Sequence, residues 1–187
     1  MSGFLFIRHA ETDMAGTFCG HLNPAVNARG HQQIQTLLKA LEAEPITSVY
    51  TSDLQRASTT AEAIAGQFEI PIVTRPHLRE ISFGEWDGLC WEQIEQRDPV
   101  YAGRWLRAYP NMPSPNGESY EAFQTRVMGE AEHLLRLSNQ GFTAVVTHAG
   151  VMRVVLRSLC GINDEQELWN RTSSYCSFFR YAQEAVL

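Results

Sequence analysis

The sequence predicts an α/β fold, a three-layer sandwich in which helices cover both faces of a mostly parallel central sheet. Short apolar runs at 4–7 and 142–147 have the length of buried strands, and segments with apolar residues at helical spacing follow them. The chain has 187 residues, of which 44% are apolar and 19% charged, so it can bury one sizeable core. We therefore expect a single domain over residues 1–187 in which strands and helices alternate.

The first half of the chain is expected to supply several strands and helices in turn. Phe4–Ile7 is a wholly apolar strand, Ser48–Thr51 is a second, and Ile70–Val73, which carries a proline, is a third near a sheet edge. Asn27 is suited to cap a helix, because apolar residues recur behind it at helical spacing: Ile34, Leu37, Leu38 and Leu41. Ser52–Gln55 fits a capping box for the next helix, whose apolar face holds Ala57, Ala61, Ile64, Ala65 and Phe68.

Residues 83–117 differ in composition from the rest of the chain. The segment contains Trp86, Trp91, Trp105, Tyr101 and Tyr109, and it ends in a loop with Pro110, Pro113, Pro115 and Gly117. We interpret it as a helical flap inserted over the sheet. Two interpretations of its aromatic side chains stay open: they form a small core of the flap itself, or they stack on a substrate.

The periodic pattern resumes after the flap. A helical face over 123–135 is formed by Phe123, Val127, Ala131, Leu134 and Leu135. Phe142–Thr147 is the strongest strand signal in the chain, Val151–Cys160 is the helix that follows it, and Gly161 closes that helix. Ser177–Tyr181 is expected to add a last strand.

The overall charge and the cysteines argue against several classes of function. The net charge is −6, from 15 basic and 21 acidic residues, so neither nucleic acid nor an anionic membrane is an expected partner. No apolar run is long enough to span a membrane, and the short apolar start lacks a basic leader. The cysteines, Cys19, Cys90, Cys160 and Cys176, are scattered without a CxxC pair, which favours reduced thiols, a cytoplasmic location and no metal site.

Basic and imidazole side chains converge at one edge of the predicted sheet. Arg8 and His9 leave the carboxyl end of the first strand, Arg56 lies in the first turn of the helix after the second, and His148 ends the 142–147 strand. In open parallel sheets the ligand crevice lies outside the carboxyl ends of the strands. Two arginines and two histidines at this edge indicate a phosphate site. The other histidines, His21, His31, His77 and His133, lie off the strand ends and are not assigned to it.

Each of these residues has a chemical role to fill at phosphorus. The guanidinium groups of Arg8 and Arg56 match pairs of phosphoryl oxygens, and their charge would lower the pKa of His9, which must be unprotonated to attack. His148, if charged, would neutralise phosphoryl oxygens in the transition state. The amides of Ala149 and Gly150 open a helix whose positive end favours an anion.

A leaving alkoxide needs a proton, and Glu80 is the candidate general acid. It lies in a loop just before the flap, where a bound dianion would raise its pKa. Taken singly, each of these residues is more often structural than catalytic. Their combination at one sheet edge favours catalysis.

Several blocks of sequence resemble the motifs of the histidine phosphatase superfamily, whose founding members are the phosphoglycerate mutases. They occur in the family's order and cover most of the chain: Ile7–Thr12 resembles RHGET, Thr51–Ala61 resembles SxLxRAxxTA, Leu78–Gly88 is similar to LREIxFGxWEG, Asn116–Ser119 to GES, and Val146–Arg153 to THGGVIR. The resemblance implies a phosphoglycerate mutase-like fold and a phosphohistidine mechanism on His9. It also implies proton donation by Glu80, a pocket of Arg8, Arg56 and His148, and no metal or organic cofactor.

The chain departs from these motifs at a few positions. Ala10 and Ala149 replace glycines beside the two histidines, so a methyl group is expected to crowd the pocket slightly. Ala15 replaces an Asn that contacts phosphate in many members, and Thr12 is the candidate to supply that contact. The family's G-x-x-D segment is here Gly20–Asn23, without the acid.

The resemblance favours a phosphatase that acts on a small-molecule phosphate ester. The stretch after Glu80 lacks the basic cluster of the mutases, and Arg97, Arg104 and Arg107 in the flap are spaced as a solvated helix face. Length and the 83–88 segment are most similar to the α-ribazole phosphatases of cobalamin biosynthesis. A broad-specificity sugar-phosphate phosphatase, a phosphoglycerate mutase, a phosphohistidine protein phosphatase and an inactive phosphate-binding regulator stay open as alternatives. Substrate, pathway and oligomeric state are not decided by the sequence.

Overall fold

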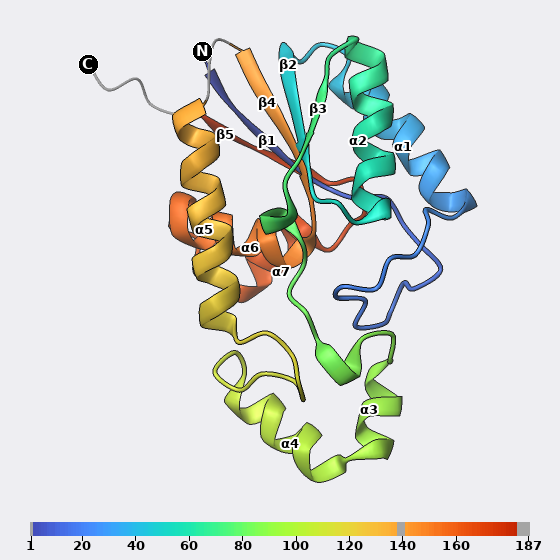
Figure 1. The fold of residues 1–187 in the computed structure, drawn as a ribbon, viewed down its shortest axis with the longest axis vertical. Helices are drawn as coiled ribbons and strands as arrows, with labels where there is room; N and C mark the ends of the chain where they lie inside the picture. Colours follow the sequence, from blue (N-terminus) through green and yellow to red (C-terminus); the bar gives the residue numbers. More distant parts are fainter. Residues whose placement is uncertain (1, 138–140, 183–187) are drawn as a thin grey trace.

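The computed structural model describes residues 2–137 and 141–182. In this part of the chain the strands form one sheet in the order β3-β2-β4-β1-β5 (Figure 1). Strands β1 to β4 are parallel, and β5 pairs antiparallel with β1. The strands span Ser2–Arg8 (β1), Ile46–Thr51 (β2), Ile72–Thr74 (β3), Gly141–Thr147 (β4) and Phe178–Ala182 (β5).

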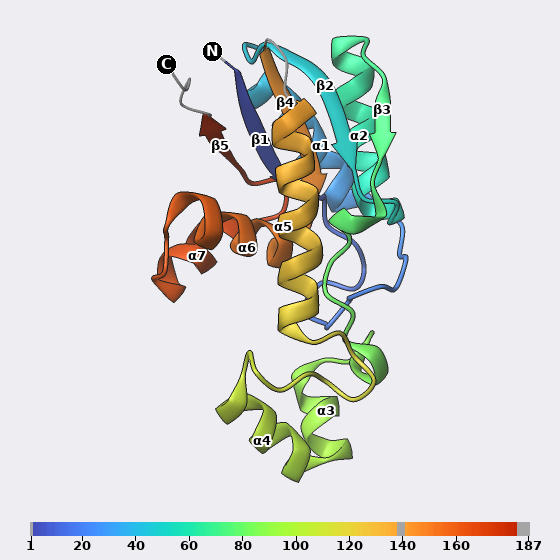
Figure 2. The ribbon, with the colours of Figure 1, turned by 60° about the vertical axis from the view of Figure 1, so that its left-hand side comes forward.

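Helices cover both faces of this sheet, as predicted (Figure 2). They span Ala28–Leu41 (α1), Gln55–Phe68 (α2), Trp91–Arg97 (α3), Pro99–Ala108 (α4), Tyr120–Leu137 (α5), Ala149–Cys160 (α6) and Glu165–Thr172 (α7), with short 3₁₀ turns at Pro76–Leu78 (η1) and Gly84–Trp86 (η2). None of the helices in the described ranges is long and apolar enough to cross a membrane.

Successive side chains of β1 point to opposite faces of the sheet, and this explains why helices cover both faces. Phe4 and Phe6 lie in one buried cluster with side chains of α5, α6 and α7, whereas Leu5 and Ile7 lie in a second cluster with α1 and α2. Each of these apolar side chains stabilises the fold by about 1.5–3 kcal/mol when fully buried. The wholly apolar composition of the run at 4–7 is thus the direct consequence of a strand with no solvent-exposed face.

Most predicted elements are confirmed. Asn27 caps α1, where its Oδ1 accepts a hydrogen bond from the Gly30 amide at 2.8 Å. Strand β3 lies at the sheet edge, and α6 ends at Gly161 in the left-handed conformation. The helix α7 was not predicted. It has eight mostly polar residues and buries only Leu168 and Thr172, so its apolar period is too weak to detect.

The predicted capping box at Ser52–Gln55 is wrong. Helix α2 begins at Gln55, and its N-cap residue, Leu54, has no side chain that can accept a hydrogen bond. Asn23, from the loop before α1, takes over that role, because its Oδ1 accepts a hydrogen bond from the Gln55 amide at 2.6 Å. Ser52 is thereby free to contact His148, and the Asp53 carboxylate pairs with the Arg79 guanidinium.

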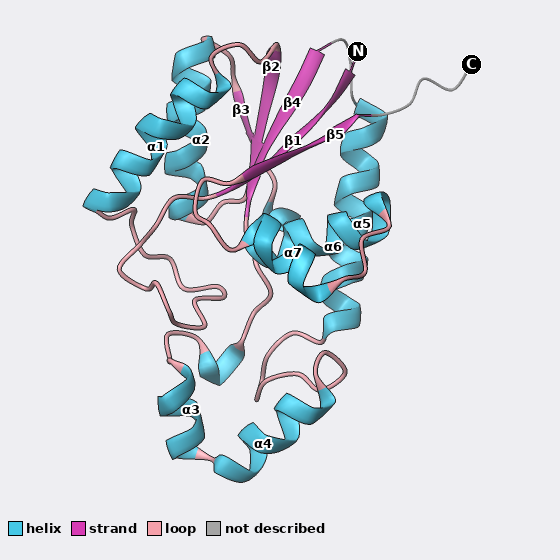
Figure 3. Ribbon diagram, turned by 180° about the vertical axis from the view of Figure 1, so that it is seen from behind, coloured by secondary structure: helices cyan, strands magenta, loops and turns pink. Residues whose placement is uncertain are grey.

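The flap segment 83–117 is helical, as expected, and lies beyond the carboxyl ends of the strands (Figure 3). Trp86 and Trp105 are buried in a cluster with Ile94 and Ala102, and their ring centroids are 5.2 Å apart. The aromatic residues of η2, α3 and α4 therefore form a small core of their own. Tyr109, which ends α4, remains half exposed.

Candidate active site

A small cationic cavity lies at the carboxyl ends of β1 and β2 and beside the start of α6. Its volume is about 110 Å³, and six of the predicted site residues line it: Arg8, His9, Thr12, Arg56, Glu80 and Ala149. His148 is fully buried behind them, and its ring centroid lies 5.0 Å from that of His9. The structure therefore brings together all the residues that the sequence placed at this edge.

The hydrogen bonds of His9 select one tautomer. Its Nδ1 lies 2.7 Å from the Ala10 carbonyl oxygen, which can only accept, so Nδ1 carries the proton. The Arg56 Nε–H donates to His9 Nε2 at 3.2 Å. Nε2 therefore keeps a lone pair on the cavity side, where it can act as a nucleophile once the Arg56 contact gives way.

The surroundings of His9 also keep this imidazole neutral. Burial lowers its pKa well below the ordinary value of 6.5, and the charges of Arg56 and Arg8 lower it further. The predicted effect of the arginines on this pKa is confirmed in direction, although burial is the larger cause.

Arg8 is held by backbone and by an aromatic ring. Its Nη1 donates to the carbonyl oxygens of Thr172 and Ser173 at the end of α7. Its guanidinium carbon lies 3.9 Å above the ring of Tyr175, which also lines the small cavity. Arg8 Nε is buried and has no hydrogen-bond partner among the described residues, so it is a donor available to an anion. The sequence reasoning did not identify Tyr175.

Arg56 is anchored by the loop before α1. Its Nη1 and Nη2 donate to the carbonyl oxygens of Leu22 and Gly20, at 2.6 and 2.8 Å. Three of its five N–H groups are engaged when the His9 contact is included, which leaves two for a phosphoryl group. The charge of Arg56 is almost fully buried, at 1% exposure, and no carboxylate among the described residues pairs with it.

The surroundings of His148 favour its neutral form when no phosphoryl group is bound. Burial lowers its pKa well below 6.5, and Arg56, His9 and Arg8 lower it further. Its Nε2 lies 2.8 Å from Ser52 Oγ, and its Nδ1 is buried without a partner in the described part of the chain. If Ser52 donates to Nε2, then Nδ1–H is left as a neutral donor.

The substituted motif positions have little effect on the cavity. Ala10 packs with Val26 and Ile34 and does not line the cavity, so the expected crowding at this position is wrong. Ala15 is exposed, and Thr12 and Thr17 line the cavity instead. Of the two alanines that replace glycines, Ala149 does line the cavity.

The Glu80 carboxylate lies against the start of α6. Its Oε2 accepts a hydrogen bond from the Gly150 amide at 3.0 Å, and its Oε1 accepts one from the Ile81 amide at 2.9 Å. A Cβ atom at position 150 would clash with the Glu80 carboxylate, so glycine permits this close approach. The positive end of α6 thus holds Glu80, and the Gly150 amide expected to bind an anion is already engaged.

A larger cavity of about 450 Å³ adjoins the small one, and Glu80, Phe83 and Ala149 line both. Its walls come from the loop before α1, the segment just before the flap, the flap itself, α5, α6 and α7. Half of the residues that line it are aromatic: Phe18, Phe83, Trp105, Tyr109, Tyr120, Phe123 and Trp169. Glu80 therefore lies between a cationic pocket and a wide apolar one. This is where an acid would meet the oxygen that joins a phosphoryl group to its leaving group.

Two arginines of α6 line the larger cavity. Arg157 pairs with Glu165 and donates to Tyr120 Oη at 3.1 Å. Arg153 donates from Nε to Thr172 Oγ1 at 2.9 Å and lies 5.0 Å from the Trp169 ring, and it forms no ion pair in the described ranges. Arg153 is one helical turn beyond Ala149, and this spacing could have identified it from the sequence.

The flap arginines Arg97, Arg104 and Arg107 are exposed and line neither cavity, as their spacing predicted.

No cluster of three or more metal-ligating side chains occurs among the residues that the structure describes. Among the residues at the small cavity, Arg8 and Arg56 carry positive charge, and His148 Nδ1 is a buried polar atom without a partner in the described ranges.

Several proteins similar in sequence to this chain are named as phosphatases. The family profile of the histidine phosphatase superfamily (branch 1) matches residues 4–184. Adenosylcobalamin/α-ribazole phosphatase of Escherichia coli K12 is 30% identical over 166 residues, which cover 88% of this chain and 81% of that protein. Phosphoserine phosphatase 1 of Hydrogenobacter thermophilus is 28% identical over 172 residues, which cover 91% and 81%. The crystal structure of the α-ribazole phosphatase from Shigella flexneri superposes with a TM-score of 0.86 at 25% identity, covering 98% of this chain and 91% of that one.

Proposed function

This chain belongs to the histidine phosphatase superfamily and is a phosphatase, and we propose that it hydrolyses small phosphate monoesters through a phosphohistidine on His9. The observation that carries the proposal is the tautomer of His9: Nδ1–H is bound to the Ala10 carbonyl and the unprotonated Nε2 lies beside two guanidinium groups. We further propose that residues 1–187 act as one cytoplasmic domain, with 83–117 as its flap and neither nucleic acid nor a membrane as its partner.

In the first step His9 Nε2 attacks phosphorus and the bond to the leaving oxygen breaks. The Glu80 carboxyl, protonated when substrate is bound, gives its proton to that oxygen, so the product leaves as a neutral alcohol. Arg8, Arg56 and the His148 Nδ1–H hold the phosphoryl oxygens, with Thr12 and the Ala149 amide as further donors. In the second step Glu80, now a carboxylate, takes a proton from water as the water oxygen attacks the phosphohistidine, which releases inorganic phosphate and free His9.

A ring-bearing leaving group suits the larger cavity best. Its volume of about 450 Å³ and its aromatic walls would accommodate a nucleoside-sized group. α-Ribazole 5′-phosphate is our preferred substrate, since the relatives in E. coli and S. flexneri bear that activity in their names. The lack of a basic cluster directly after Glu80 supports hydrolysis over a mutase that retains a bisphosphate.

A second candidate, phosphoserine, is favoured by Arg153. This cation faces the larger cavity without an ion pair in the described part of the chain, and a carboxylate on the leaving group would match it. A relative named phosphoserine phosphatase has a similar identity to this chain. The cavity is, however, much larger than a serine side chain requires, so we keep α-ribazole 5′-phosphate first.

The test is a comparison of kcat/KM for α-ribazole 5′-phosphate, phosphoserine, 3-phosphoglycerate and glycerol phosphate in the wild type and in Arg153→Met. We expect α-ribazole 5′-phosphate to exceed glycerol phosphate by at least about tenfold, since remote contacts are expressed in the chemical step. If phosphoserine is the better substrate and loses about 10–100-fold in Arg153→Met, as the loss of a charge-assisted hydrogen bond predicts, the second candidate replaces the first. Equal rates on all four substrates would refute both and leave an unselective phosphatase.

A further inference from the structure

The segment that carries Glu80 has no regular secondary structure, yet its backbone carbonyl groups are well satisfied by side chains. Residues 79–83 lie between the short turns η1 and η2. Thr147 Oγ1 donates to the Leu78 carbonyl oxygen at 2.8 Å, and His21 Nε2 lies 2.9 Å from the Glu80 carbonyl oxygen. His21 was not assigned to the site from the sequence, because it lies in a loop far from any strand end.

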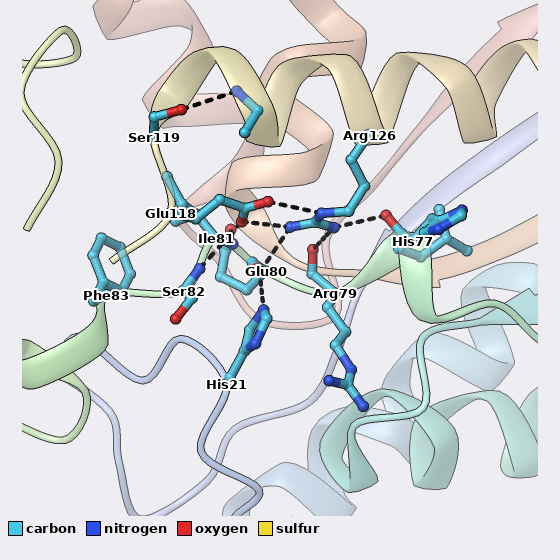
Figure 4. A network of polar contacts seen from close by, with 12 residues as sticks. His21, His77, Arg79, Glu80, Ile81, Ser82, Phe83, Glu118, Ser119 and Arg126 are labelled. Atoms are coloured by element: carbon cyan, nitrogen blue, oxygen red, sulfur yellow. Dashed lines mark hydrogen bonds and ion pairs between the residues drawn. The ribbon is translucent and has the colours of Figure 1, made fainter. Parts of the chain in front are cut away.

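Arg126 of α5 makes most of the remaining contacts to this segment (Figure 4). Its Nη1 donates to the carbonyl oxygens of His77 and Arg79 at 2.8 and 2.9 Å, and its Nη2 donates to that of Glu80 at 3.3 Å. One guanidinium group thus binds three backbone carbonyl groups of the stretch that ends at the acid, those of His77, Arg79 and Glu80 itself. An irregular loop with its carbonyl groups bound in this way has few alternative conformations.

The same guanidinium is paired with Glu118, which follows the flap. Arg126 Nε and Nη2 donate to the two Glu118 carboxylate oxygens at 2.9 and 2.7 Å, and both side chains are less than one-fifth exposed. Glu118 in turn joins the two ends of the flap, since its amide donates to the Ser82 carbonyl at 2.9 Å and its Oε2 accepts from the Ser82 amide at 3.4 Å. The pair is therefore shared between the flap and the acid-bearing segment (Figure 4).

We propose that Arg126, aligned by Glu118, is a positioning residue that sets Glu80 for proton transfer to the leaving group. Arg126 touches only the backbone of Glu80, and it lines neither cavity, so it acts through the acid and not on the substrate. When Arg126 is lost, the Glu80 carboxyl drifts from the leaving oxygen, and a displacement of about 1 Å is enough to cost about a hundredfold in rate. The inference rests on the proposed role of Glu80 as the general acid.

The test compares two leaving groups by kcat/KM, which reports phosphoryl transfer to His9 and excludes the later hydrolysis step. Glycerol phosphate needs a proton from the acid, whereas nitrophenolate leaves p-nitrophenyl phosphate without help. For Arg126→Met we expect kcat/KM on glycerol phosphate to fall about 10–100-fold and on p-nitrophenyl phosphate to fall less than about threefold. Arg126→Lys, which keeps the charge and some of the donors, should restore part of the loss.

Two further variants separate positioning from loss of stability. Arg75→Met removes another bidentate ion pair, which joins Arg75 to Glu130 of α5, the helix that also carries Arg126. This pair does not contact the Glu80 backbone. Arg75→Met should lower the melting temperature and leave the ratio of the two kcat/KM values unchanged. Glu118→Gln should change that ratio in the same direction as Arg126→Met, and the double variant should be no worse than Arg126→Met, because the two residues act as one unit.

Glu80→Gln serves to separate the two hypotheses. If this variant lowers kcat/KM equally for both substrates, Glu80 is not the acid and the proposed function needs a different proton donor. The other outcome is that Glu80→Gln lowers kcat/KM for glycerol phosphate much more than for p-nitrophenyl phosphate. If folded Arg126→Met then keeps the wild-type ratio of the two kcat/KM values, the positioning role is refuted and the role of Glu80 as the acid stands. Arg126→Lys takes the place of Arg126→Met if the latter does not fold.

Discussion

His9 and His148 illustrate how much of this site depends on individual side chains. The two rings are buried within 5.0 Å of each other, beside the guanidinium groups of Arg8 and Arg56. A cluster of this kind is unfavourable without an anion, because like charges repel and burial removes water from them. An anion bound beside Arg8 and Arg56 would relieve that cost, so we expect a phosphoryl group to stabilise this cluster.

Stability should therefore fall as the pH is lowered through the ordinary range of histidine. The pKa values of His9 and His148 lie below 6.5 in the folded chain, so the unfolded chain binds more protons in acid, and the free energy of unfolding rises with pH. Each group contributes a slope of up to about 1.4 kcal/mol per pH unit. This slope is measured by urea unfolding of the wild type and of His148→Asn between about pH 5 and 6.5. The variant should show the smaller slope; equal slopes would mean that His148 is protonated in the folded state.

At the scale of elements, two helices supply aromatic side chains to the wall of the larger cavity. Helix α4 of the flap and its C-cap residue supply Trp105 and Tyr109, and α7 supplies Trp169. Trp86 and Trp91 instead lie within the flap's own core. Most of the aromatic residues in 83–117 thus form a core, as one of the two interpretations predicted, and stacking on a substrate stays a prediction for those that face the cavity.

Tyr109 is the flap residue best suited to test contact with a leaving group, because it is half exposed and lines the cavity. In Tyr109→Ala we expect kcat/KM for α-ribazole 5′-phosphate to fall about three- to tenfold, the value of one aromatic contact, while p-nitrophenyl phosphate is spared. Tyr101→Leu is the matched control, since Tyr101 packs in the flap core and does not line the cavity. If the two variants lose the same activity on both substrates, the flap aromatics stabilise the flap without contacting substrate.

For the molecule as a whole, local sequence patterns predicted the sheet, most helices and the edge where the site lies. Arg8, His9 and His148 could be placed because they directly follow or end strands, and parallel strands share one carboxyl edge. The role of Ser52 could not be predicted, because its partner His148 lies far away in sequence and a local capping motif competed for the same residue. Arg126 was not identified from the sequence, because a guanidinium group that binds loop carbonyl groups leaves no periodic signal. Helix α7 was not predicted because it is short and polar.

The central claim, a covalent phosphoryl group on His9, is tested most directly by trapping it. The enzyme is mixed with ³²P-labelled substrate in excess EDTA and quenched in alkali, where a phosphohistidine survives. We predict label in the peptide that contains His9, stable in base and lost in acid, unaffected by EDTA and absent in His9→Ala, which should also lose more than about a hundredfold in turnover. Label on another residue, or turnover near the wild-type rate in folded His9→Ala, would contradict the account.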